Sequence, residues 1–319
     1  MSTDAVKGMI VVGVEEVANG SSAAALEFAA REANRRRLPV KIVHGCAPHH
    51  QFGPVSQNTQ SERISRGRRV VDAAARRISK LTDPAIRIYV TNSLMGGVDL
   101  LVEESQGAVL IVVQRRELGR VARVSTGSVT SAVAVRSNCP VVVVRDVHRR
   151  HSGSGLLVGV DGTGRSAYAL STAAELASQR RIPLVVVHAW DVPVPSTPEF
   201  GYVPPTLDER ALTRASAHRL LSEATAGLAV DYPDLDLRTR LVRGAPKDVL
   251  RQLGHEAEMM FVSCHSQTGP GFFALGPVAR SLINSAPCPV LVTSAAVPPS
   301  RPRTQLQTDG VVDPRSFVS

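Results

Sequence analysis

The chain has 319 residues, of which 43% are hydrophobic and 20% charged, and its formal net charge is +9. This length and composition are typical of a globular protein with two domains, each large enough to have its own core. No apolar run reaches the roughly 18–20 residues that a membrane-spanning helix needs, so we expect no such helix.

The first half of the sequence alternates short apolar runs with helical patterns. We expect strands at residues 8–14, 40–46, 86–91, 108–113 and 140–145. We expect helices at about 21–37, 61–81, 95–105 and 127–137, with 114–126 as a loop.

The second half repeats this order after a polar segment, 146–154, which we interpret as a linker. Strands are expected at residues 156–160, 184–189, 237–242, 259–263 and 290–293, and helices at about 166–181, 207–228, 246–256 and 277–286. The tail after residue 296 is rich in proline and polar residues, which predicts disorder. The predicted domains are therefore 1–147 and 148–296, followed by a disordered tail, 297–319.

A gap-free repeat supports duplication. Gly127, Cys139 and Pro140 recur 149 residues later as Gly276, Cys288 and Pro289, each time before a valine-rich strand. Short apolar strands that alternate with helices predict a parallel sheet covered on both faces. The expected fold class is α/β, with two tandem doubly wound five-stranded parallel-sheet domains.

Charge and cysteine usage limit the function classes. Residues 1–147 carry +7 and residues 148–319 carry +2, because arginines cluster at 35–37, 63–69 and 76–77. We interpret these as solvated helix faces, since only 4% aromatic residues argue against nucleic-acid binding. The four cysteines have no C-x-x-C spacing, so Cys139 and Cys288 are expected to pack as small apolar groups.

The sequence contains nine histidines. His49, His50, His148 and His151 lie in loop-like segments, where we expect surface positions rather than a metal site. A strand-length run at the N-terminus is followed by two glutamates, which does not fit a signal peptide. The cytoplasm is therefore the expected compartment.

A ligand of an open parallel sheet binds beyond the carboxyl ends of the strands. In the second half the first strand ends at Asp161, whose carboxylate can accept hydrogen bonds from a ribose or an adenine amino group, or can cap the next helix. Both roles stay open. After the fourth strand, small residues run from Ser263 to Gly276, and the helix that begins there adds its dipole toward an anion.

Both halves resemble universal stress protein domains. The resemblance rests on the strand-end Gly-x-Asp, on Val43-His44 and Val187-His188, and on Cys-Pro-Val before the last strand. It implies a five-stranded parallel sheet with four helices, and in nucleotide-binding members an ATP held by the strand-end Asp and a G-x2-G-x9-G-[ST] motif. Carried over, the resemblance implies a site for ATP or another adenine nucleotide, with magnesium as a further expectation. Its residues are Asp161, Ala189, Ser263, Ser266 and Gly276.

The phosphate motif departs from this pattern in both halves. In the first, Gln114 and Glu117 stand at the two glycine positions, while Gly127 and Ser128 remain, and Glu15 replaces the strand-end Asp. In the second, the two glycines become Ser263 and Ser266, and the final pair becomes Gly276-Pro277, which loses one N–H donor. We therefore expect any nucleotide in the second half.

Two functions from different classes follow. The first is a stress-response regulatory module that binds an adenine nucleotide. The second is a structural or protein-interaction module with no nucleotide. The last strands are expected to pair, either within the chain as a pseudo-dimer or between chains as a homodimer. The sequence lacks G-x-S-x-G, H-E-x-x-H and Walker A motifs, so we do not expect an enzyme, although weak ATP hydrolysis stays open.

Overall fold

The computed structural model describes residues 8–15, 22–46, 60–115, 129–150, 152–191, 196–197, 201–202, 206–264 and 275–293. The predicted tail 297–319 lies outside these residues, as do His49, His50 and His151. No helix within the described ranges is long and apolar enough to cross a bilayer.

In the part of the first repeat that the structure describes, there are five strands and four α-helices. Its strands are β1 Met9–Gly13, β2 Val40–Gly45, β3 Ile88–Ser93, β4 Ala108–Gln114 and β5 Val141–Val144. Its helices are α1 Ala23–Arg36, α2 Gln60–Ser79, α3 Gly97–Glu104 and α4 Val129–Arg136. Each expected element is present, with bounds that differ by a few residues.

The second repeat has the same order. Its main strands are β6 Leu156–Gly159, β7 Leu184–Trp190, β10 Leu237–Arg243, β11 Met259–Ser263 and β12 Val290–Thr293. Its helices are α5 Gly164–Arg180, α6 Leu207–Thr225, α7 Leu228–Asp231, α8 Pro246–Leu253 and α9 Pro277–Ser285. The helix expected at about 207–228 is present as α6, but it ends at Thr225. A turn at Ala226 and Gly227 separates it from α7, which the sequence did not predict. Two short strands, β8 Ser196–Thr197 and β9 Gly201–Tyr202, pair with each other.

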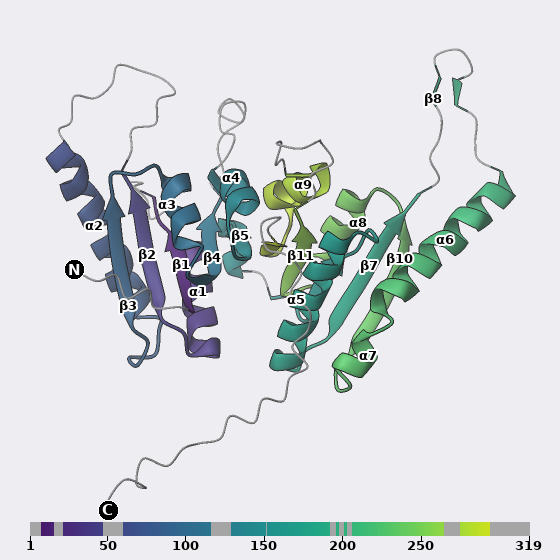
Figure 1. Ribbon diagram of the computed structural model, residues 1–319, viewed down its shortest axis with the longest axis horizontal. Coiled ribbons are helices and arrows are strands. Elements are labelled where there is room, and N and C mark those ends of the chain that lie inside the picture. Colours follow the sequence, from purple (N-terminus) through teal and green to yellow (C-terminus); the bar gives the residue numbers. More distant parts are fainter. Residues whose placement is uncertain are drawn as a thin grey trace, which may run out of the picture.

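The ten main strands form one sheet, in the order β10-β7-β6-β11-β12-β5-β4-β1-β2-β3. Within each repeat all neighbours are parallel, whereas β5 and β12 are antiparallel, with Val142 opposite Leu291. The last strands therefore pair within the chain, as in the predicted pseudo-dimer. Figure 1 shows the two halves side by side, with α2 and β3 at one end and β10 and α6 at the other.

Two hydrophobic cores lie on opposite faces of this sheet and continue through both repeats. One joins α1, α2, α5 and α6 to the sheet, and its largest buried side chains include Ile10 and Phe261. The other joins α3, α4, α8 and α9, and contains Val141 and Met260. Cys139 and Cys288 pack in this second core, as predicted.

An ion-pair network also joins the repeats. Glu32 of α1 is buried, and both of its carboxylate oxygens accept hydrogen bonds from Arg180 Nη2 of α5, at 2.6 and 2.7 Å. Arg180 Nη1 contacts Glu258 at 2.9 Å, and Arg36 Nε contacts Glu32 at 3.0 Å. Burial lowers the pKa of Arg180, and the charge of Glu32 opposes that effect.

The predicted linker is partly ordered. Residues Asp146–Arg150 form a short 3₁₀ helix, and His148 is 5% exposed, so the predicted surface position of His148 was wrong. Its Nδ1 accepts a hydrogen bond from the backbone N–H of Arg145, and its Nε2 lies 2.9 Å from the carbonyl oxygen of Ala286. The histidine is buried because it connects the end of β5 to the C-terminal end of α9.

Candidate functional site

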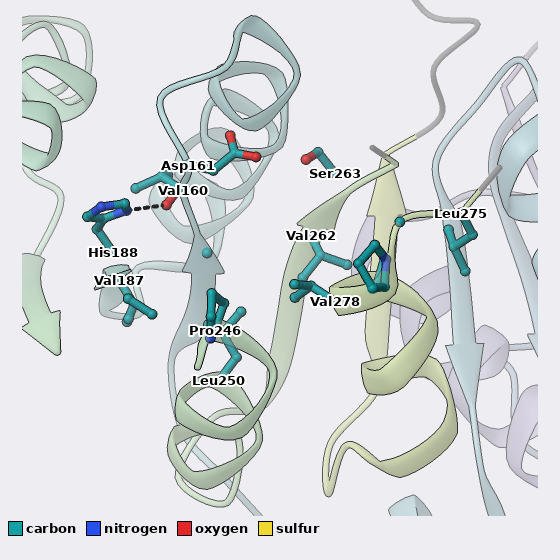
Figure 2. A pocket seen from close by; sticks show the side chains of 15 residues that line it. Val160, Asp161, Val187, His188, Pro246, Leu250, Val262, Ser263, Leu275 and Val278 are labelled. Atoms are coloured by element: carbon teal, nitrogen blue, oxygen red, sulfur yellow. Dashed lines mark hydrogen bonds between the residues drawn. The ribbon is translucent and has the colours of Figure 1, made fainter. Parts of the chain in front are cut away.

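A cavity of about 470 Å³ lies at the carboxyl ends of β6, β7 and β11 in the second repeat, beside the start of α9. This is where an open parallel sheet binds its ligands, and the volume lies within the usual range for small-molecule sites. Figure 2 shows Asp161 and Ser263 on either side of its upper end, with Leu250 and Pro246 at its base.

Asp161 follows β6 and holds the turn that leads into α5. Its Oδ1 accepts hydrogen bonds from the backbone N–H of Thr163 at 3.0 Å and from Thr163 Oγ1 at 2.7 Å. Thr163 is the N-cap of α5, since its own side chain accepts from the N–H of Ser166. Asp161 therefore does not cap the helix itself, but positions the residue that does. A carboxylate has several acceptor sites, so Asp161 can hold this turn and still accept from a ligand.

A histidine braces the end of the same strand. His188 Nδ1 lies 2.8 Å from the carbonyl oxygen of Val160, and because a carbonyl only accepts, Nδ1 is the donor. The first repeat has the same bond, from His44 Nδ1 to Val14 at 2.8 Å. In the sequence, Val-His could be recognised only as part of the family resemblance. Its occurrence in both halves was the signal for this role.

The walls of the cavity are mostly apolar. Val160, Val187, Leu250, Val262 and Val278 line it. At the base, a Cβ on Gly159 would lie 2.8 Å from Leu250 Cδ1, so a larger residue there would require the end of the Leu250 side chain to move. An apolar slot with a few polar groups at one end suits a flat ring that carries a polar substituent.

The start of α9 forms the other side of the cavity. Gly276 is the N-cap in an extended conformation, with no side-chain cap hydrogen bond, and Pro277 is the first helical residue. The backbone N–H groups of Val278 and Ala279 lie in the first turn of the helix, where intrahelical acceptors are lacking. Ser263 ends β11 on the same side. This helix end can attract an anion, with one N–H fewer than a helix without proline.

Four of the five residues predicted for nucleotide binding line this single cavity. These are Asp161, Ala189, Ser263 and Gly276. The fifth, Ser266, lies in 265–274, outside the described residues. The structure thus brings together residues that are more than a hundred positions apart in sequence.

In the first repeat, the corresponding strand end carries a longer polar side chain, Gln114. Gln114, at the end of β4, accepts hydrogen bonds through Oε1 from the backbone N–H groups of Ala24 and Ala25, at 2.9 and 3.2 Å. Its Nε2 donates to Asp146 at 2.9 Å. The side chain at this glycine position therefore satisfies the first turn of α1. Glu117, Gly127 and Ser128 lie outside the described residues.

A second difference reduces the space between the end of β2 and the loop before α3 in the first repeat. Gly45 stands where the second repeat has Ala189, directly after the histidine that both repeats contain. A Cβ at Gly45 would lie 2.7 Å from the backbone nitrogen of Gly97 and 2.8 Å from the carbonyl oxygen of Met95. The loop before α3 therefore approaches β2 closely at this point.

Among the described residues, no group of three or more His, Cys, Asp or Glu side chains could hold a metal ion. Burial raises the pKa of the Cys139 and Cys288 thiols to about 12, so both are protonated at neutral pH.

Comparison with known proteins places this chain in a family. The model of the universal stress protein family matches residues 9–145 and 155–294. The universal stress protein Rv2623 of Mycobacterium tuberculosis is 29% identical over 292 residues, covering 89% of this chain and 95% of that protein. A universal stress protein of Mycolicibacterium smegmatis is 30% identical over 290 residues, covering 89% and 96%.

Solved structures agree on the fold. A universal stress protein from Archaeoglobus fulgidus covers 91% of this chain and 96% of its own, with a TM-score of 0.64 at 15% identity. Two shorter structures align with less than half of the chain. One is a universal stress protein in complex with cAMP, at 22% identity and a TM-score of 0.34, and the other is that of Archaeoglobus fulgidus in complex with dAMP, at 26% and 0.31.

Proposed function

This chain belongs to the universal stress protein family, and we propose that it is a regulatory module that binds one adenine nucleotide, in the cavity of its second repeat. The single observation that carries this proposal is the convergence of Asp161, Ala189, Ser263 and Gly276 on one cavity at the carboxyl ends of the strands.

The lining suits the parts of a nucleotide. The apolar walls, which include Val160, Val187 and Leu250, offer a dry surface for the purine ring. Asp161 lies at the rim, where its carboxylate would accept hydrogen bonds from ribose hydroxyls. The proposal of adenine as the base rests on the family resemblance.

The phosphate end is weaker than the base end. Ser263 offers a hydroxyl and the first turn of α9 offers the N–H groups of Val278 and Ala279, whereas Pro277 offers none. We therefore propose that a nucleoside monophosphate binds nearly as tightly as the triphosphate. Few hydrogen-bond donors are placed to contact the additional phosphates. Magnesium stays a prediction of the resemblance.

The proposed role is binding rather than catalysis. The polar groups of the cavity have structural partners: His188 is bonded to Val160, and Asp161 to Thr163. Neither arrangement pairs a nucleophile with a base. A cytoplasmic location stays a prediction of the sequence.

The alternative function, a protein-interaction module without nucleotide, is favoured for the first repeat by one observation. Gln114 accepts a hydrogen bond from the first turn of α1 and donates one to Asp146. We propose that the first repeat keeps the fold and has lost the ligand, so that the two repeats have different tasks.

Titration calorimetry of the full chain with AMP tests the proposal. Ala189→Phe fills the cavity, and Asp161→Ala removes the rim carboxylate; both are expected to weaken AMP binding at least about tenfold, which is about 1.4 kcal/mol. Glu15→Ala, at the matching position of the first repeat, is the control and should leave the affinity unchanged. An affinity that survives Ala189→Phe, or no binding by the wild-type chain, would sink the proposal.

A further inference from the structure

A second hollow, of about 840 Å³, lies between α1 and α2 of the first repeat. Five exposed basic side chains line it, all from α2 or the residue that follows it: Arg66, Arg69, Arg76, Arg77 and Lys80. We call this hollow the basic groove. Glu15, at one end, is the only acidic residue among its described lining.

The floor of the basic groove is apolar and made largely of small side chains. Ala23 and Leu26 come from α1, and Val70 and Ala74 from α2. Alanines leave room for the side chain of another molecule, and the surrounding arginines keep that molecule's charged groups near water. An apolar floor with a cationic rim is the complement of a segment that carries both carboxylates and apolar side chains.

Three of these cations have no ionic partner among the described residues. Arg77 pairs with Glu27 at 3.1 Å. Within the part of the chain that the structure describes, no salt bridge is recorded for Arg69, Arg76 or Lys80. Neighbouring like charges repel one another, so an anionic partner would relieve a cost that the free protein bears.

The second repeat lacks this arrangement. Gly67, Val71 and Ile78 of the first repeat correspond to Ala217, Leu221 and Leu228, which are also buried and each lie 150 residues later. In this register the five cations correspond in order to Ser216, Arg219, Ala226, Gly227 and Val230. Only one cation is shared, so the fold does not require the other four.

We propose that the basic groove docks an acidic peptide segment of a partner protein, one with apolar side chains among its carboxylates. The apolar floor makes no favourable contact with a phosphodiester backbone. None of the described lining residues is aromatic, so nucleic-acid bases have no side chain to stack on. This inference stands apart from the nucleotide site, since the basic groove lies in the first repeat.

Fluorescence anisotropy of the full chain with a labelled glutamate–leucine peptide tests the proposal. Arg69→Glu with Arg76→Glu is expected to weaken binding at least about tenfold, and binding should fall as salt is raised. Arg214→Glu with Arg219→Glu, two exposed arginines of α6, makes the same change in net charge elsewhere and should have little effect. Arg69→Gln with Arg76→Gln gives a milder second variant, and circular dichroism checks folding.

Two further probes distinguish the contribution of the apolar floor to binding from that of charge alone. A peptide with serine in place of leucine should bind more weakly, and an oligothymidylate of equal charge should bind more weakly than the glutamate–leucine peptide. Equal loss in the α6 control, tighter binding of the oligothymidylate, equal binding of the serine peptide, or no peptide binding would each overturn the proposal.

Discussion

His188 Nδ1 donates a hydrogen bond of 2.8 Å to the carbonyl oxygen of Val160, and so fixes the strand end from which Asp161 projects. His44 and Val14 make the same bond in the first repeat, where we propose no ligand. The same bond therefore occurs once beside the candidate cavity and once in the repeat where Gln114 bonds to the first turn of α1, so variants of the two histidines can separate stability from binding.

The first prediction uses that pair. Either His188→Ala or His44→Ala removes one side chain–backbone bond, and each is expected to lower the free energy of unfolding by about 1 kcal/mol, measured by urea denaturation. His188→Ala should also weaken AMP binding several-fold, because Val160 and Asp161 lose their brace. His44→Ala should leave AMP binding unchanged. Equal AMP affinity in both variants would show that the bond is purely structural.

The second prediction concerns the ion pair between the repeats. Arg180→Leu removes the Nη2 group that bonds both oxygens of the buried Glu32, and because Arg36 stays in contact with Glu32, the free energy of unfolding is expected to fall by about 2 kcal/mol. Arg238→Leu is the matched control, because its pair with Asp236 is fully exposed and screened by solvent, so the free energy of unfolding should change much less. Comparable losses in the two variants would mean that the buried network does not hold the repeats together.

The third prediction follows from the buried thiols. Burial raises the pKa of Cys139 and Cys288 from 9.0 to about 12. Below pH 9 both states hold these protons. As pH rises from 9 toward 12, the unfolded chain releases them while the folded chain keeps them, so stability falls by up to about 1.4 kcal/mol per pH unit for each thiol.

The double variant Cys139→Ala with Cys288→Ala isolates this effect from other alkaline titrations. Its free energy of unfolding, measured by urea denaturation at several pH values, should fall less steeply above pH 9 than that of the wild type. Parallel profiles would contradict the assignment of raised thiol pKa values.

The sequence predicted the order and class of nearly every element, because continuous valine-rich runs and alanine-rich helices are strong local signals. It missed the break after Thr225, where the helical pattern continues to Leu228 but Gly227 weakens it. It also missed the burial of His148, since the acceptor for that ring is the carbonyl of Ala286, far away in sequence.

The candidate site was predicted in part. Asp161 and Gly276 follow from strand ends and helix starts, which sequence patterns reveal. The role of Gln114 depends on its reach to Ala24 and Ala25, across the sheet, which no local pattern encodes. Glu32 gave a usable signal, a carboxylate on the buried face of an alanine-rich helix, but its partner Arg180 lies in the other repeat.

The central claim is that the two repeats have divided their tasks, with a nucleotide site in the second alone. The stoichiometry of AMP on the full chain, measured by equilibrium dialysis at saturation, tests it most directly. We predict one AMP per chain in the wild type and in Glu15→Ala, and loss of that site in Ala189→Phe. Two nucleotides per chain, or one that persists in Ala189→Phe, would contradict the division of the repeats.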